Sequence, residues 1–276
     1  MKNGGAAPVR SASKEKKRSS PPKVHGRFDG LVVIITGSSS GIGQATAIQF
    51  AKEGASVTLH GQSTERLEET KKQIIAAGIS KSKVLIISGP IQDESIQDKL
   101  IDETAKHFGK LDVLVNNAGC PTKPGIDQNS LETFDFVFEV NVRAVYRLIQ
   151  IAVPHLEKTK GSIVNLSSGL SQKPSPLMIP YSITKAAINH LTRNFASALA
   201  SKGIRVNAVA PGIVSTEFHD RSGMGGNHVL DVAKNIVPLN RAGRPEEQAQ
   251  LILNIAAPDN SYMTGSIIFN DGGLIL

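Results

Sequence analysis

The chain has 276 residues, enough for one large α/β domain with a buried core. Its longest apolar run, residues 31–35, is far shorter than the roughly 20 residues of a membrane helix. The single cysteine, Cys120, excludes an internal disulfide and suits a reducing compartment. We therefore expect a soluble, cytoplasmic protein that does not bind a membrane.

The net charge of +7 comes entirely from the first 27 residues, which hold eight basic and one acidic side chain. This tail is rich in Ser, Pro and Gly, and its composition predicts a disordered extension. It could be functionally silent, or a localisation or polyanion-binding element around residues 14–18. A transit peptide fits less well, because the tail is Lys-rich and broken by proline. The neutral remainder of the chain gives no reason to expect a nucleic-acid partner.

From residue 31 onward, short runs rich in Val, Ile and Leu alternate with longer segments of helical spacing. The runs are too short for helices and are typical of strands covered on both faces. The predicted strands are 31–36, 56–60, 84–88, 111–116, 161–167, 205–210 and 266–270. Their alternation with helices predicts an α/β fold with a doubly wound parallel seven-stranded sheet, the Rossmann fold, as a single domain over residues 28–276.

Capping residues predict where several helices begin and end. One helix is predicted to begin at Ser63 or Thr64 and to end at Gly78. A second is predicted to begin at Asp93 and to end at Gly109, and Pro245 is predicted to begin a third. Two longer helices are expected over 130–154 and 181–202. The Gly-rich stretch 212–244 breaks this rhythm and is predicted to be a mobile substrate lid.

A glycine-rich turn, Thr-Gly-Ser-Ser-Ser-Gly-Ile-Gly at residues 36–43, follows the first strand and opens the first helix. Gly37 permits a tight turn, Gly41 lets the backbone approach a phosphate, and Gly43 lets the helix pack on the sheet. The free N–H groups of the helix N-terminus favour a pyrophosphate. This pattern predicts dinucleotide binding.

Further predicted cofactor contacts lie at the carboxyl ends of other strands, where a bound dinucleotide lies in such sheets. Asn-Asn-Ala-Gly at 116–119 and Pro-Gly at 211–212 end two of them. The predicted cofactor-binding residues are Gly37, Ser39, Ser40, Gly41, Ile42, Gly43, His60, Gly61, Gln62, Asn117, Ala118, Gly119, Tyr181, Lys185, Pro211, Gly212, Val214 and Thr216.

Tyr181 and Lys185 are spaced i, i+4 and should share one helix face. A nearby ammonium favours the phenolate, so a lowered pKa would let Tyr181 exchange a proton with an alcohol or alkoxide. Ser168, just past a strand end, could hydrogen-bond the substrate oxygen, although Ser167 could take that role instead. Asn141 lies inside a predicted helix, where its amide could hold a water beside Lys185, kink the helix or make a core hydrogen bond.

With these motifs, residues 28–276 resemble the short-chain dehydrogenase/reductase family. Residues 36–43 look like its TGxxxGxG motif, 116–119 like NNAG, 181–185 like YxxxK and 211–212 like PG. The resemblance implies that Tyr181 is the catalytic acid/base and that Lys185 lowers its pKa and binds the nicotinamide ribose. It also implies that Ser168 orients the carbonyl and that Asn141 holds a proton-relay water. Family members are usually dimers or tetramers, with the two long helices at an interface.

The end of the second strand favours NADP, with NAD as the alternative. Gly61 stands where NAD-preferring relatives carry Asp, and residues 59–63 contain no carboxylate. Uncharged donors could hydrogen-bond a phosphate instead; these are Ser38, Ser39, His60, Gln62 and Ser63. Gly89 and Pro90 replace the Asp with which relatives usually contact adenine, a second departure from the family pattern.

The expected substrate region, 171–179 and 212–229, is mostly apolar and suits a ketone, an aldehyde or a lipid-like alcohol. It holds, among others, Pro174, Pro176, Leu177, Met178, Phe218 and Met224. The spacing of His219 and His228 does not indicate a metal site. The sequence therefore predicts an NADP(H)-dependent oxidoreductase that interconverts a carbonyl and an alcohol. The alternatives are a non-catalytic NADP(H)-binding regulator and an NAD-dependent alcohol dehydrogenase of the same fold.

Overall fold

The computed structural model describes residues 1, 26–219 and 226–276, so most of the basic tail and part of the expected lid lie outside it. Seven parallel strands form one sheet in the order β3-β2-β1-β4-β5-β6-β7. The strands are β1 Val32–Ile35, β2 Ser56–Gly61, β3 Val84–Ser88, β4 Val113–Asn116, β5 Ser162–Leu166, β6 Arg205–Pro211 and β7 Ile267–Asn270. The predicted doubly wound sheet is confirmed, with each strand within a residue or two of its expected place.

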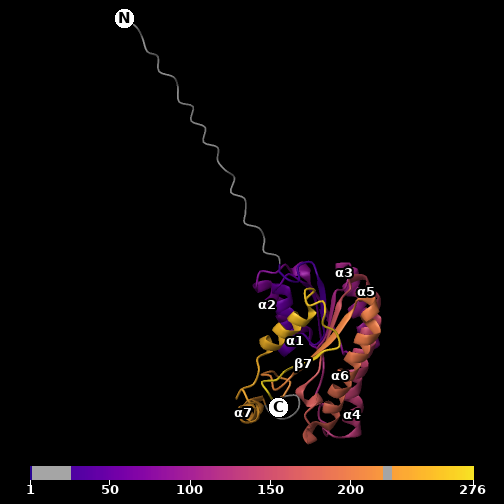
Figure 1. Ribbon diagram of the computed structural model, residues 1–276, viewed down its shortest axis with the longest axis vertical. Coiled ribbons are helices and arrows are strands. Elements are labelled where there is room, and N and C mark those ends of the chain that lie inside the picture. Colours follow the sequence, from indigo (N-terminus) through magenta and orange to yellow (C-terminus); the bar gives the residue numbers. More distant parts are fainter. Residues whose placement is uncertain (2–25, 220–225) are drawn as a thin grey trace.

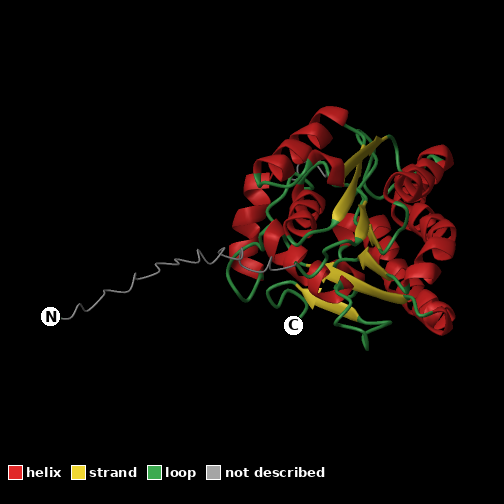
Figure 2. Ribbon diagram, turned by 90° about the horizontal axis from the view of Figure 1, so that it is seen from above, coloured by secondary structure: helices red, strands yellow, loops and turns green. Residues whose placement is uncertain are grey.

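Helices cover both faces of the sheet, and Figure 2 shows the strands running between them. The helices are α1 Gly41–Lys52, α2 Thr64–Ala76, α3 Glu94–Phe108, α4 Leu131–Phe138, α5 Ala144–Thr159, α6 Ile179–Leu199, α7 Gly226–Ile236 and α8 Pro245–Ala256. In Figure 1, α1 and α2 lie on one side of the sheet and α3, α5 and α6 on the other. Each face has its own buried apolar cluster, one with α1, α2 and α8 and one with α3, α5 and α6.

Strand β1 lies between β2 and β4 and pairs parallel with both. The strand order reverses at this point, which opens a crevice at the carboxyl ends of the strands. The glycine-rich turn follows β1, and the NNAG residues 116–119 follow from β4. The topology therefore brings together two motifs that are about eighty residues apart in the chain.

The predicted caps are confirmed at α2 and α3. The Ser63 side chain accepts a hydrogen bond from the backbone N–H of Arg66, and the Asp93 carboxylate accepts one from Ser95 at 2.8 Å. Gly109 ends α3 in the left-handed conformation, with φ +84°. These boundaries depend on local contacts, which is why the sequence predicts them.

Two helical predictions need correction. The helix expected over 130–154 is divided by a π-helical turn, η2 at Glu139–Arg143, and α5 continues past Pro154 to Thr159. The expected lid contains a helix that its glycines concealed, α7, whose Ala233 is buried against Leu274 together with Val237, the residue that follows the helix. In the described part of the chain, no helix is both long and apolar enough to cross a membrane.

Candidate active site

The three glycines of the turn between β1 and α1 lie where a side chain would not fit. Gly41 has φ +56°, and a Cβ there would lie 3.0 Å from the Thr216 methyl group. A Cβ on Gly43 would lie 2.2 Å from the Gly37 carbonyl oxygen. Bare backbone therefore faces the crevice at the N-terminus of α1, an arrangement that fits the pyrophosphate of a dinucleotide.

Asn117 and Ala118 join the NNAG residues to this turn. The Asn117 side-chain nitrogen donates to the carbonyl oxygens of Thr36 at 2.8 Å and Gly37 at 3.1 Å. The Ala118 backbone N–H donates to the Thr36 hydroxyl at 3.0 Å. Because its amide hydrogens hold the turn, Asn117 shapes the crevice, and any cofactor contact falls to the backbone around it.

His60 is not available to a phosphate, contrary to the sequence-based expectation. It is 2% exposed, its Nδ1 accepts from the Gly37 N–H at 3.5 Å, and its Nε2 lies 3.1 Å from the Gly89 carbonyl oxygen. Burial lowers the pKa of His60 to about 4, so the ring is neutral at neutral pH. The Ser38 hydroxyl is not available either, because it forms hydrogen bonds with the His60 backbone. Both residues hold the ends of β1, β2 and β3 together.

Tyr181 and Lys185 lie on one face of α6, as predicted, and both side chains are buried. The Lys185 ammonium donates to the Leu166 carbonyl oxygen at 2.7 Å and lies 5.6 Å from the centre of the Tyr181 ring. Burial lowers the pKa of Lys185 to about 8. Lys185 therefore remains mostly charged at neutral pH, close to the phenol.

The expectation of a lowered pKa for Tyr181 is wrong for this structure. Burial raises the pKa of the phenol well above its usual value, and a hydrogen bond with Ser168 offsets only part of that rise. The residue is thus a protonated phenol at neutral pH, the form that can donate a proton.

The structure separates the two neighbouring serines that the sequence left as alternatives. Ser168 shares a hydrogen bond with Tyr181, and its hydroxyl also accepts the Leu170 N–H at 3.1 Å. Ser167 instead donates to the Asn189 side chain at 2.6 Å and to the Lys185 carbonyl oxygen at 3.2 Å. Ser168 alone of the two has its hydroxyl beside the phenol.

The sequence leaves three explanations for an asparagine inside this helix, and the structure shows one of them, core hydrogen bonds made by Asn141. Its Oδ1 accepts from the Cys120 N–H at 2.9 Å, and its Nδ2 donates to the Cys120 carbonyl oxygen at 2.9 Å and to Thr184 at 3.1 Å. A Cβ on Gly119 would lie 3.2 Å from Asn141 Oδ1 and 3.5 Å from Lys185 Nζ. Asn141 therefore connects the NNAG residues to α6 next to the Lys185 ammonium.

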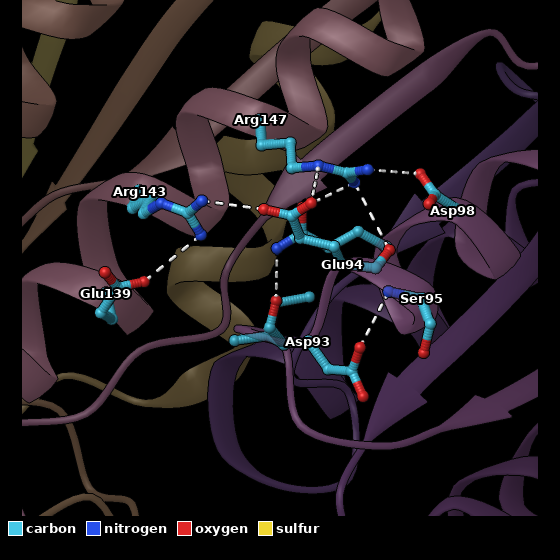
Figure 3. Close-up of polar contacts among 9 residues, drawn as sticks. Asp93, Glu94, Ser95, Asp98, Glu139, Arg143 and Arg147 are labelled. Carbon is cyan, nitrogen blue, oxygen red and sulfur yellow. Dashed lines mark hydrogen bonds and ion pairs between the residues drawn. The ribbon is translucent and has the colours of Figure 1, made fainter.

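The π-helical turn that carries Asn141 is linked to α3 by exposed ion pairs, which Figure 3 shows. Arg143 pairs with Glu94 at 2.8 Å and with Glu139 at 3.5 Å. Arg147, on α5, pairs with Asp98 at 2.8 Å and with Glu94 at 3.5 Å. π-Helical turns often occur at functional sites, and this one lies where the catalytic helix meets the cofactor crevice.

The loop after β6 packs over the candidate site. The Phe218 ring lies 5.6 Å from the Tyr181 ring, centre to centre, so this part of the expected apolar region does reach the catalytic tyrosine. The two ends of the expected lid are paired, because Val214 forms a parallel bridge with Gly243. Pro211 ends β6, and a Cβ on Gly212 would lie 2.8 Å from the Asp271 backbone. Met224 lies outside the described residues.

The chain's C-terminal segment also borders this region, which the sequence did not indicate. A Cβ on Gly169 would lie within about 4 Å of the Leu274 and Ile275 side chains, and Lys173 donates to the Leu274 carbonyl oxygen at 2.8 Å. No local pattern in residues 271–276 predicts this contact, because it depends on the return of the chain after β7.

Among the residues that the structure describes, no three His, Cys, Asp or Glu side chains gather as metal ligands would. The His219 ring bonds the Val214 carbonyl oxygen at 3.2 Å. The side chain of His228 lies outside the described part of the chain. Cys120 is a half-buried cysteine that forms no disulfide, and it lies beside the site.

The sheet has a glycine-rich turn at its switch point and a buried tyrosine and lysine on α6 nearby. Together these features define a dinucleotide-binding α/β oxidoreductase. A family model described as enoyl-(acyl carrier protein) reductase matches residues 37–275. The 3-oxoacyl-(acyl-carrier-protein) reductase of Thermotoga maritima is 36% identical over 252 residues, which cover 91% of this chain and 100% of that protein.

Two further proteins extend the comparison. The 7α-hydroxysteroid dehydrogenase of Clostridium sardiniense is 38% identical over 91% of this chain and 95% of that protein. A Caenorhabditis elegans short-chain dehydrogenase/reductase of unknown function, solved with cofactor, is 41% identical with a TM-score of 0.85, covering 90% of this chain and 96% of that one. This chain belongs to the short-chain dehydrogenase/reductase family. It is an oxidoreductase that uses a nicotinamide cofactor, NAD or NADP.

Proposed function

We propose that this protein is an NADPH-dependent reductase that converts a ketone or aldehyde to an alcohol, with Tyr181 as the proton donor. The observation that carries the proposal is the buried Tyr181 phenol, hydrogen-bonded to Ser168 and close to the Lys185 ammonium. A buried phenol holds its proton at neutral pH, so Tyr181 can donate that proton to a carbonyl oxygen.

Each side chain has a distinct task in this reaction. A bound NADPH would supply the hydride that the carbonyl carbon receives. Ser168 hydrogen-bonds the carbonyl oxygen and stabilises the negative charge that develops there. Tyr181 then gives its proton to that oxygen, and the Lys185 ammonium stabilises the phenolate that is left.

Lys185 has capacity for a cofactor contact as well. Its ammonium has three N–H groups, and the Leu166 carbonyl oxygen takes one of them. Gly119, which has no side chain, lies beside it. We therefore assign Lys185 to the nicotinamide ribose. Asn141 is assigned to holding the NNAG backbone against α6, since both of its amide hydrogens are engaged.

The preference for NADP is supported by Gly61 at the end of β2. A Cβ there would lie 2.9 Å from the Ser39 hydroxyl, so a carboxylate that grips the ribose of NAD would require the Ser39 side chain to move. Ser39, Ser40, Ile42, Gln62 and the backbone at Val214 and Thr216 remain proposed contacts. NAD is the alternative cofactor.

We also infer a single catalytic domain over residues 28–276, with a lid over 212–244, that acts in the cytoplasm as a dimer or tetramer. The outer faces of α5 and α6 support the oligomer, since Tyr146 and Ile183 are half exposed there.

The test is a screen of NADPH oxidation with aldehydes, diketones, quinones, steroid ketones and 3-oxoacyl thioesters. We expect at least one class to be reduced, because the region around Phe218 and Tyr181 is apolar. The same screen with NADH should give slower turnover. Tight NADPH binding without oxidation of any class would favour the non-catalytic regulator instead.

A further inference from the structure

An ion pair joins the first turn of α2 to the loop after β6. The Arg66 guanidinium donates to the Glu217 carboxylate, across 151 positions of the chain. Arg66 is held at the start of α2, where its backbone N–H bonds the Ser63 hydroxyl at 3.3 Å. Both side chains are about half exposed, at 50% and 54%. A pair of this exposure is weak and can be exchanged for another partner.

The surroundings of this pair place it at the adenosine end of the cofactor crevice. On one side, Ser63 lies two residues after Gly61, the position that selects between the two cofactors. On the other side, Thr216 precedes Glu217 and lies 3.0 Å from the Cβ position of Gly41. The guanidinium therefore lies between the end of β2 and the glycine-rich turn, where the adenosine ribose of a dinucleotide belongs.

Most of the uncharged side chains that the sequence suggested as phosphate donors in this region already form hydrogen bonds within the protein. Both ring nitrogens of His60 and the Ser38 hydroxyl bond the backbone. The Ser63 hydroxyl caps α2. A dianionic phosphate here needs a cation, and an arginine can offer it two parallel N–H donors.

We propose that Arg66 is the residue that recognises the adenosine 2′-phosphate of NADP, and that Glu217 is its partner until the phosphate displaces it. This inference rests on the proposed use of NADP. The ribose of NAD carries only a hydroxyl at that position and cannot compete with a carboxylate for the guanidinium. The exchange thus makes Arg66 and Glu217 a pair that discriminates between the two cofactors.

The experiment measures dissociation constants of NADPH and NADH by fluorescence titration of the full chain without substrate. The variants are Arg66→Gln, Glu217→Gln and, as a control, Lys72→Gln, which removes a cation from the same helix where it pairs with Glu69. Arg66→Gln should weaken NADPH binding by about tenfold and leave NADH binding unchanged. Glu217→Gln should tighten NADPH binding by about threefold, because the competing carboxylate is gone. Lys72→Gln should change neither.

Two other results would overturn the proposal. Equal weakening of NADPH and NADH in Arg66→Gln would mean a structural role for the arginine, and unchanged NADPH binding would mean that it does not contact the phosphate. Circular dichroism of each variant shows whether the fold is kept. If the unaltered chain binds NADH more tightly than NADPH, the proposed cofactor preference itself fails; if it prefers NADPH but Arg66→Gln does not alter the ratio, only this inference fails.

Discussion

The two ends of the cofactor crevice are built in opposite ways. At the catalytic end, Tyr181 and Lys185 are 7% and 5% exposed and bond to groups within the core. At the adenosine end, Arg66 and Glu217 are half exposed and meet in a surface ion pair. Proton transfer needs fixed geometry and a controlled pKa, which burial supplies. Discrimination between NADP and NAD needs only one charged side chain that can change partners. Such a side chain can lie at the surface.

Removing the Tyr181 hydroxyl should show most clearly that catalysis and cofactor binding depend on different ends of the crevice. Tyr181→Phe keeps the ring that packs on Phe218 but removes the proton donor. Turnover should fall by about 10²–10⁴-fold, while NADPH affinity stays close to that of the unaltered protein. Steady-state kinetics and fluorescence titration measure the two quantities. Near-normal turnover in this variant would mean that another group donates the proton.

The adjacent serines allow a matched pair of variants at the catalytic end. Ser168→Ala should reduce turnover by about 10²-fold, because it removes a donor to the carbonyl oxygen. Ser167→Ala removes hydrogen bonds to Asn189 and to the Lys185 backbone, so it should lower thermal stability with a far smaller loss of turnover. A reversed order of the two activities would assign the substrate contact to Ser167.

The burial of Lys185 should be visible in the pH dependence of stability. Its folded-state pKa is about 8, compared with an ordinary 10.5, so between these values the unfolded chain binds more protons than the folded one. The protein should therefore gain stability relative to Lys185→Met as pH rises from 8 to 10.5. Thermal melting of both proteins across that window tests this, and parallel curves would contradict a buried ammonium.

At the adenosine end, His60 should give an effect of comparable size at acid pH. Its pKa falls from 6.5 to about 4 on folding, so the neutral ring stabilises the protein above pH 6.5 and this contribution is lost as pH falls through 4. His60→Gln should show a shallower loss of melting temperature over that interval. A loss as steep as that of the unaltered protein would place the titrating group elsewhere.

The sequence predicts the catalytic end better than the adenosine end. Tyr181 and Lys185 are one helical turn apart, and the glycines around residue 41 follow a strand directly, so short spacings carry the information. The direction of the Tyr181 pKa shift could not be predicted, because it depends on burial by residues from other elements. The same holds for His60, whose ring partners, Gly37 and Gly89, come from two different strand ends.

Elements that depend on long-range contacts were missed or misread. Helix α7 lies in a Gly-rich stretch and is held by Leu274 from the C-terminal segment. The π-helical turn at Asn141 is fixed by Arg143 and Glu94, which are 49 positions apart. Arg66 has no partner in its own sequence neighbourhood that indicates a cofactor role, because Glu217 reaches it only after the chain has folded.

The central claim, hydride transfer to a carbonyl carbon with proton donation from Tyr181, can be tested directly with an isotope. NADPH carrying deuterium at both C4 positions of the reduced nicotinamide is mixed with the enzyme and a carbonyl compound found active in the screen, and the alcohol is examined by mass spectrometry. The account predicts deuterium on the carbinol carbon with the unaltered protein and almost no alcohol with Tyr181→Phe. Alcohol without deuterium, or equal labelled product from both proteins, would contradict it.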